Sequence, residues 1–145
     1  MSIEDRLADL GIDLPPVAKP VAAYVPAIQV GDQISTSGQL PLVSGSLPMT
    51  GLVGDQISQG DAAGQARVAA LNALAAAADV AGGVNNIRRV VRVVVYVAST
   101  ADFTAQPAVA NGASELFGEI FGDAGRHIRS AIGVASLPLG APVKV

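Results

Sequence analysis

The chain has 145 residues, 50% of them apolar and only 14% charged, with a formal net charge of −3. This length is enough for one domain with a hydrophobic core, and the low charge together with a positive mean hydropathy excludes a disordered chain. There is no cysteine and only one histidine, which excludes disulfides, thiolate metal sites and multi-histidine zinc sites. We therefore expect no metal and no cofactor.

The charge and the apolar composition also bear on partners. An acidic chain is poorly suited to neutralising phosphates, which argues against a nucleic-acid partner. No apolar run approaches the roughly 18–20 residues of a membrane span, and the polar start MSIEDRLADLG does not resemble a signal peptide, so we expect no membrane association and a cytoplasmic protein. Alanine and valine bury little area per residue, so we expect apolar surface to be covered by other copies of the chain in a homo-oligomer.

The first sixty residues contain short elements separated by proline and glycine. Residues 1–22 predict a short acidic helix followed by an arm that its prolines keep from being helical. Residues 24–30 and 33–37 predict two strands of a hairpin, with Gly31-Asp32 at the turn. Residues 41–60 show no periodicity and predict a long surface loop.

The clearest helix is predicted from Asp61 to Ala81, where Gly82 and Gly83 end it. Its polar residues Gln65, Asn72 and Asp79 recur every seven positions. This spacing keeps them on one side of the helix and predicts a narrow polar stripe opposite an apolar face.

The second half of the chain alternates strands and helices. Residues 87–98 are dominated by β-branched side chains and predict a central strand that is covered on both faces. A helix is predicted over 104–121, and strands over 128–134 and 142–145. The order β-β-α-β-α-β-β predicts an α+β fold, a mixed sheet with two helices on one face, in a single domain spanning residues 1–145.

Arginine offers the main sign of chemistry. Arg129 lies near the start of an apolar strand, where a guanidinium is costly without an anionic partner. That partner is either a neighbouring carboxylate of the chain or a bound carboxylate. Arg88, Arg89 and Arg92 are interpreted as solvated or as forming ion pairs between subunits, rather than as an RNA-binding patch, since no aromatic platform accompanies them and the chain is acidic. His127 is interpreted as a partly exposed surface histidine rather than a general base.

Several short motifs occur in order from Tyr24 to Val145. They are Tyr24 followed by T-S-G-Q-L-P at 36–41, Q-A-R at 65–67, Asp102-Phe103 with Asn111, Glu115 and Phe117, and R-S-x-x-x-V-A-x-L-P at 129–138. This series resembles the signature of the YjgF / reactive-intermediate deaminase (RidA) superfamily.

The resemblance implies a chorismate-mutase-like fold assembled as a barrel-like homotrimer, with ligand clefts between subunits. It further implies that Arg129 is the catalytic residue and binds the carboxylate of an enamine or imine. Water then converts this enamine or imine to a 2-oxo acid and ammonia. By the same resemblance, Tyr24, Ser37, Asn111 and Ala131 are ligand-binding positions. The expected partner is a small carboxylate-bearing molecule.

The chain also departs from the family pattern. Ala131 stands where the family often has cysteine, and Gly133 stands where many deaminases have glutamate. The glutamate that activates water in the family is expected immediately after Val145. Two alternatives to a deaminase therefore stay open: a non-catalytic trimer that binds small carboxylates, and an endoribonuclease, which the acidic charge disfavours.

Overall fold

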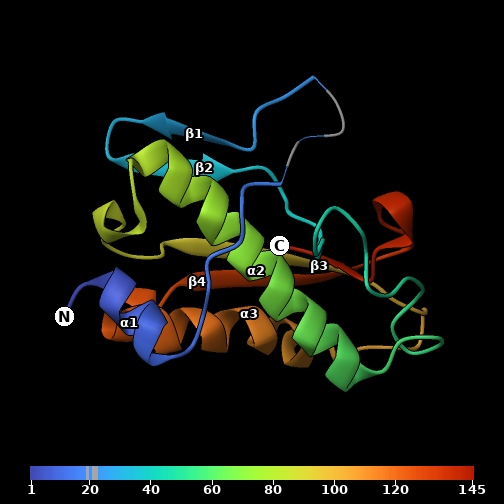
Figure 1. Cartoon of the computed structure of the whole chain (residues 1–145). Coiled ribbons are helices and arrows are strands. Elements are labelled where there is room, and N and C mark those ends of the chain that lie inside the picture. The colour runs from blue at the N-terminus through green and yellow to red at the C-terminus, as the bar shows by residue number, and fades with distance from the viewer. Residues whose placement is uncertain (19, 21–22) are drawn as a thin grey trace.

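A computed structural model describes residues 1–18, 20 and 23–145 (Figure 1). Among these residues, three α-helices, the first of them short and N-terminal, and five strands follow one another in the predicted order. Their bounds are α1 Ile3–Asp9, β1 Ala27–Val30, β2 Gln33–Thr36, α2 Gln59–Ala81, β3 Arg92–Ala98, α3 Gln106–Phe121, β4 Ile128–Val134 and β5 Val143–Lys144. The short acidic helix is thus confirmed as α1, whereas residues 19, 21 and 22 of the predicted arm lie outside the described residues.

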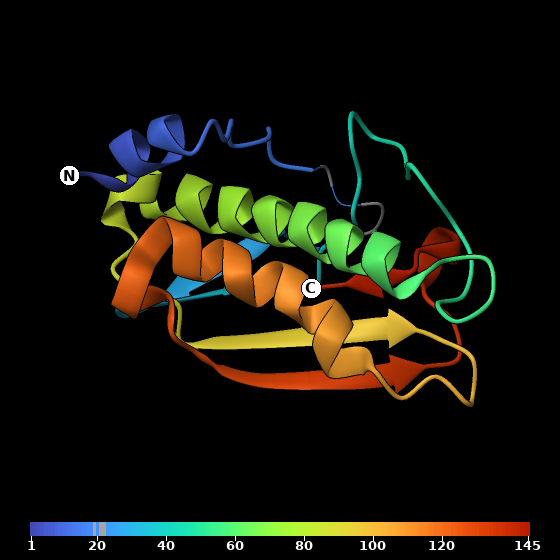
Figure 2. The ribbon, with the colours of Figure 1, turned by 90° about the horizontal axis from the view of Figure 1, so that it is seen from below.

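The sheet is mixed, and both long helices lie on one face of it. β3 pairs in parallel with β4 and antiparallel with β5, giving the order β4-β3-β5. β1 and β2 form an antiparallel hairpin, and a pair of backbone hydrogen bonds between Gln39 and Val145 joins this hairpin to the β5 side of the sheet. Figure 2 shows α2 and α3 side by side over one face of β3 and β4, with the opposite face uncovered. The predicted fold class is confirmed.

The central strand β3 explains why its sequence is so uniformly apolar. Val93, Val95 and Val97 are buried beneath the helices, while Val94 and Tyr96, which alternate with them, are half-buried on the uncovered face. The prediction that both faces are covered is therefore wrong for a single chain, in which helices cover one face. The apolar residues on the other face are available to a second copy.

The polar stripe predicted on α2 is wrong for two of its three members. Gln65 and Asn72 are 7% and 3% exposed, and only Asp79 faces solvent. Asn72 donates from Nδ2 to the carbonyl oxygens of Leu40 and Leu42, each at 3.0 Å. Asn72 therefore holds the start of the segment that precedes α2, whereas Asp79 faces water.

Residues 41–60 also differ from the predicted surface loop. Val53 and Ile57 are buried in the core, and Val53 forms a bridge with Ser99 beside the end of β3. Ser58 then accepts a hydrogen bond from the backbone of Asp61 and caps α2, which is why the helix begins two residues earlier than predicted.

We expect Asn72→Ala to lower the free energy of unfolding by about 2 kcal/mol, because two partly buried carbonyl groups lose their donor. Urea denaturation measures this loss. Asn86→Ala is the control, since Asn86 is exposed and its single contact to the Ala81 carbonyl is replaceable by water. Equal losses in the two variants would contradict the role assigned to Asn72.

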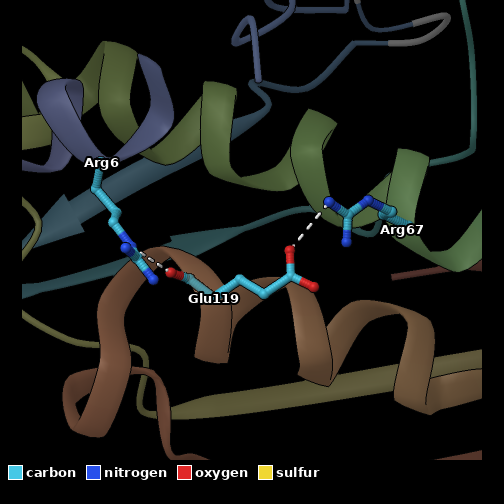
Figure 3. Close-up of polar contacts among 3 residues, drawn as sticks. All are labelled: Arg6, Arg67 and Glu119. Carbon is cyan, nitrogen blue, oxygen red and sulfur yellow. Dashed lines mark hydrogen bonds and ion pairs between the residues drawn. The ribbon is translucent and has the colours of Figure 1, made fainter. Parts of the chain in front are cut away.

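α1 is fastened to the end of α3 near Glu119 (Figure 3). Arg6 Nε donates to the Glu119 carbonyl oxygen at 2.8 Å, and Arg67 Nη2 of α2 pairs with Glu119 Oε2 at 3.1 Å. Ser2 caps α1, and its hydrogen bonds hold the pKa of the exposed Asp5 carboxyl below its ordinary value.

Among the described residues, no helix combines the length and the apolarity needed to cross a membrane.

Candidate anion-binding site

Arg129 of β4 is held by two side chains of α3. Its Nη1 donates to Asn111 Oδ1 at 2.8 Å and to Ser114 Oγ at 3.1 Å. Asn111 and Ser114 are three residues apart and so lie on the same face of the helix. The structure therefore brings the predicted residues Asn111 and Arg129 together and adds Ser114, which sequence reasoning missed.

The guanidinium of Arg129 has no carboxylate partner in the described part of the chain. The two ion pairs found there are Arg67–Glu119 and Arg126–Asp123, and neither involves Arg129. Because its two described hydrogen bonds both use Nη1, the edge formed by Nε and Nη2 remains available. That edge is the planar fork that matches the two oxygens of a carboxylate. Within the described residues, Arg129 therefore pairs with no acidic neighbour, which is the alternative that the sequence left open.

His127 continues the same hydrogen-bond chain. Its Nδ1 lies 2.7 Å from the Gly125 carbonyl oxygen, and its Nε2 lies 2.9 Å from Ser114 Oγ. A carbonyl oxygen only accepts, so Nδ1 carries the proton, and in the neutral ring Nε2 accepts from the Ser114 hydroxyl. The ring is partly exposed, as predicted, but both of its nitrogens are engaged and it makes a T-shaped contact with Phe117, with ring centroids 6.0 Å apart.

These side chains line an open hollow of about 470 Å³, a volume in the range of small-molecule sites. Its lining residues are Ser114, Gly118, Gly125, Arg126, His127 and Arg129. A larger hollow of about 780 Å³ lies between the N-terminal arm and α2. Its lining carries the exposed carboxylates of Glu4, Asp13 and Asp79, which would repel an anion. The hollow beside Arg129 is therefore the candidate site.

Ala131 lies on the open edge of the sheet. The amide of Ile128 donates to the Val91 carbonyl at 3.0 Å, and the carbonyl of Val134 accepts from Ser99 at 3.1 Å. Backbone groups alternate along a strand, so these even-numbered residues of β4 bond to β3 and the odd-numbered residues face outward. The backbone of Ala131 is thus exposed at the edge, two residues from Arg129, while its side chain packs against the core.

The side chains around Gly133 leave little room for a side chain at that position. A Cβ atom there would lie 2.7 Å from Gln106 Nε2 and 3.2 Å from Ser99 Oγ. A glutamate at this position, as in many deaminases, would have to displace Gln106.

The other two predicted ligand-binding residues, Tyr24 and Ser37, lie beyond the β5 edge of the sheet, whereas Arg129 is on β4 at the opposite edge. Ser37 follows β2, where its Oγ donates to the Pro26 carbonyl at 3.3 Å and accepts from Gln39 Nε2 at 3.1 Å. Tyr24 precedes β1 and is 48% exposed. β5 and β3 separate this side from β4, a span of three strand spacings or about 14 Å. One chain therefore does not bring Tyr24 or Ser37 to Arg129.

Comparison with known proteins identifies the family. The family model described as "YjgF/chorismate mutase-like, putative endoribonuclease" matches residues 4–145. The chain belongs to the YjgF/chorismate mutase-like family. Protein TCP17 of Trypanosoma cruzi, also similar, is 41% identical over 97% of this chain and 88% of its own length.

Two solved structures share the YjgF-like fold over almost the whole chain. The Agrobacterium tumefaciens protein Atu1372, described as of unknown function, is 42% identical with a TM-score of 0.87, covering 99% of this chain and 87% of that one. A Shewanella oneidensis protein described as a "putative endoribonuclease" is 33% identical with a TM-score of 0.94, covering 99% and 95%.

The described residues of this YjgF-like chain offer no group of three histidine, cysteine, aspartate or glutamate side chains placed to hold a metal ion. The polar groups at the candidate site are those of arginine, serine, histidine and an amide side chain.

Proposed function

We propose that this protein hydrolyses enamine or imine intermediates to 2-oxo acids and ammonia, with the substrate carboxylate anchored by Arg129. The observation that supports this is the state of Arg129: two neutral side chains hold its Nη1, and its Nε–Nη2 edge has no carboxylate partner within the described residues. An arginine preset in this way loses little conformational entropy when a carboxylate binds.

The demands of the reaction are modest. A protonated imine already reacts with water, so much of the rate gain comes from orienting the two and stabilising the charge that changes on carbon. A carboxylate fixed on Arg129 places the adjacent C=N carbon close to the guanidinium. The outward amide of Ala131 is a further donor at the same edge of the sheet.

The complete site is proposed to form between subunits of a homotrimer. Tyr24 and Ser37 lie on the far side of the sheet from Arg129, so they reach a ligand on Arg129 only if a second copy supplies them. The uncovered sheet face carries Ile128 and Ile132, which are 68% and 43% exposed, and an apolar face of this kind favours association. Light scattering should therefore give three times the mass of one chain, and a monomer would contradict the shared cleft.

The activity is tested by generating imines with an amino-acid oxidase in the presence of semicarbazide, which traps them as semicarbazones. The protein is expected to lower semicarbazone formation, because hydrolysis competes with trapping. Heat-denatured protein is the control for non-specific effects. An unchanged signal across small, branched and aromatic imino acids would contradict the proposal.

A non-catalytic carboxylate-binding trimer is the second candidate. The residues lining the hollow include no aspartate or glutamate, which leaves the site without a carboxylate base. Calorimetric binding of 2-oxobutanoate without any effect on semicarbazone formation would favour this candidate. An endoribonuclease, the activity named in the description of the family, would instead cleave RNA in an assay without imines.

A further inference from the structure

Ser114 and His127 are more than is needed to hold a carboxylate. Asn111 already fixes Arg129 Nη1, yet Ser114 connects the same nitrogen to an imidazole ring. We infer that Ser114 and His127 form a proton relay that activates the attacking water, an inference that rests on the proposed imine hydrolysis.

The hydrogen-bonding capacity of Ser114 leaves room for one water. A serine hydroxyl has one donor and two acceptor lone pairs. Its proton is directed to His127 Nε2 at 2.9 Å, and one lone pair accepts from Arg129 Nη1 at 3.1 Å. The remaining lone pair can accept from a water in the hollow that Ser114 and Arg129 both line.

The orientation of the His127 ring is fixed by the hydrogen bond of Nδ1, the ring nitrogen that does not contact Ser114. The bond from Nδ1 to the Gly125 carbonyl keeps Nε2 as the accepting nitrogen. Gly125 itself is tightly placed, because a Cβ atom there would overlap the carbonyl oxygen of Phe117. Among the residues that line the hollow, His127 alone has a basic lone pair, since arginine stays protonated. The relay therefore ends at the one group there that can take a proton.

The proton movements balance over the reaction. As the water oxygen bonds to the carbon of the protonated imine, one water proton passes to Ser114 Oγ while the Ser114 proton passes to His127 Nε2. The resulting carbinolamine takes a proton back through Ser114 on its nitrogen. The C–N bond then breaks, ammonia leaves with its electron pair, and the hydroxyl proton is transferred to ammonia as the carbonyl forms. Imine cation and water thus give 2-oxo acid and ammonium.

The test compares His127→Gln and Ser114→Ala with the wild-type protein in the imine assay. Glutamine keeps a polar group near Ser114 but cannot take a proton, so kcat should fall by about 10²–10³-fold in both variants. KM and the calorimetric Kd for 2-oxobutanoate should stay within about threefold, because Asn111 still holds Arg129. Ser114→Thr, which keeps the hydroxyl, should retain most of kcat. Asp55→Asn is the control, because Asp55 is exposed, lies between β2 and α2 and is absent from the lining of the hollow.

Three results would overturn the relay, and they are distinguishable. A His127→Gln protein with wild-type kcat would show that no proton reaches the imidazole. Loss of 2-oxobutanoate binding in both variants would show that Ser114 and His127 only position Arg129. A wild-type protein without imine hydrolysis would overturn the proposed function, and the relay with it.

Discussion

Replacing Arg129 by alanine is expected to lower kcat/KM for imine hydrolysis by about 10²–10⁴-fold. The variant loses two charge-assisted hydrogen bonds to the substrate carboxylate, which are worth about 3–6 kcal/mol together, and about 1.4 kcal/mol corresponds to a factor of ten in rate. The semicarbazone assay measures the effect over a range of imine concentrations, and calorimetry should show a matching loss of 2-oxobutanoate binding.

Two further variants make this result specific. Arg129→Lys keeps the positive charge but not the planar fork, so it should retain only weak binding. Arg88→Ala removes an exposed arginine that does not line the hollow and should leave kcat/KM unchanged. An Arg129→Ala protein as active as Arg88→Ala would remove the carboxylate anchor from the mechanism.

The second large effect concerns Gly112, which follows Asn111 where α3 crosses α2. A Cβ atom at this position would overlap the carbonyl oxygen of Ala63 in α2. Alanine ordinarily stabilises a helix interior by about 1 kcal/mol relative to glycine. Here the overlap involves backbone rather than a flexible side chain, so Gly112→Ala should lower the free energy of unfolding by at least about 2 kcal/mol.

Gly64→Ala is the matched control for this substitution. Gly64 lies inside α2, is exposed, and has no neighbouring atom within 4 Å of an added Cβ. It should therefore show the ordinary helix preference and become more stable by about 0.5–1 kcal/mol. Denaturation of both variants should give shifts of opposite sign. A stabilised Gly112→Ala protein would mean that the two helices do not cross as closely as described.

Much of the fold follows from local signals. Residues 128–134 were predictable as a strand from their composition and flanks, and the end of α2 from Gly82, whose φ of 83° favours glycine. Burial of Asn72 was not predictable, because its partners Leu40 and Leu42 are about thirty residues away and are brought to it by the segment between β2 and α2. Heptad spacing places polar residues on one side of a helix but does not say what covers that side.

The candidate site also contains some residues that the sequence indicated and others that it did not. The family resemblance indicated Arg129 and Asn111, which lie 18 residues apart in the sequence and meet in the structure. Ser114 and His127 carried no motif, and their pairing depends on how α3 packs against β4. The available signals were weak: Ser114 is one turn after Asn111, and His127 lies two residues before Arg129. Sequence alone did not connect the two pairs.

The most direct measurement is a crystal structure of the protein with 2-oxobutanoate. We expect the carboxylate oxygens at about 2.7–2.9 Å from Nε and Nη2 of Arg129, with Nη1 still bound to Asn111 and Ser114. Tyr24 and Ser37 of a neighbouring copy should border the same ligand. A structure in which Arg129 pairs with a protein carboxylate while 2-oxobutanoate is absent from the hollow would contradict the assignment of this residue as the anchor.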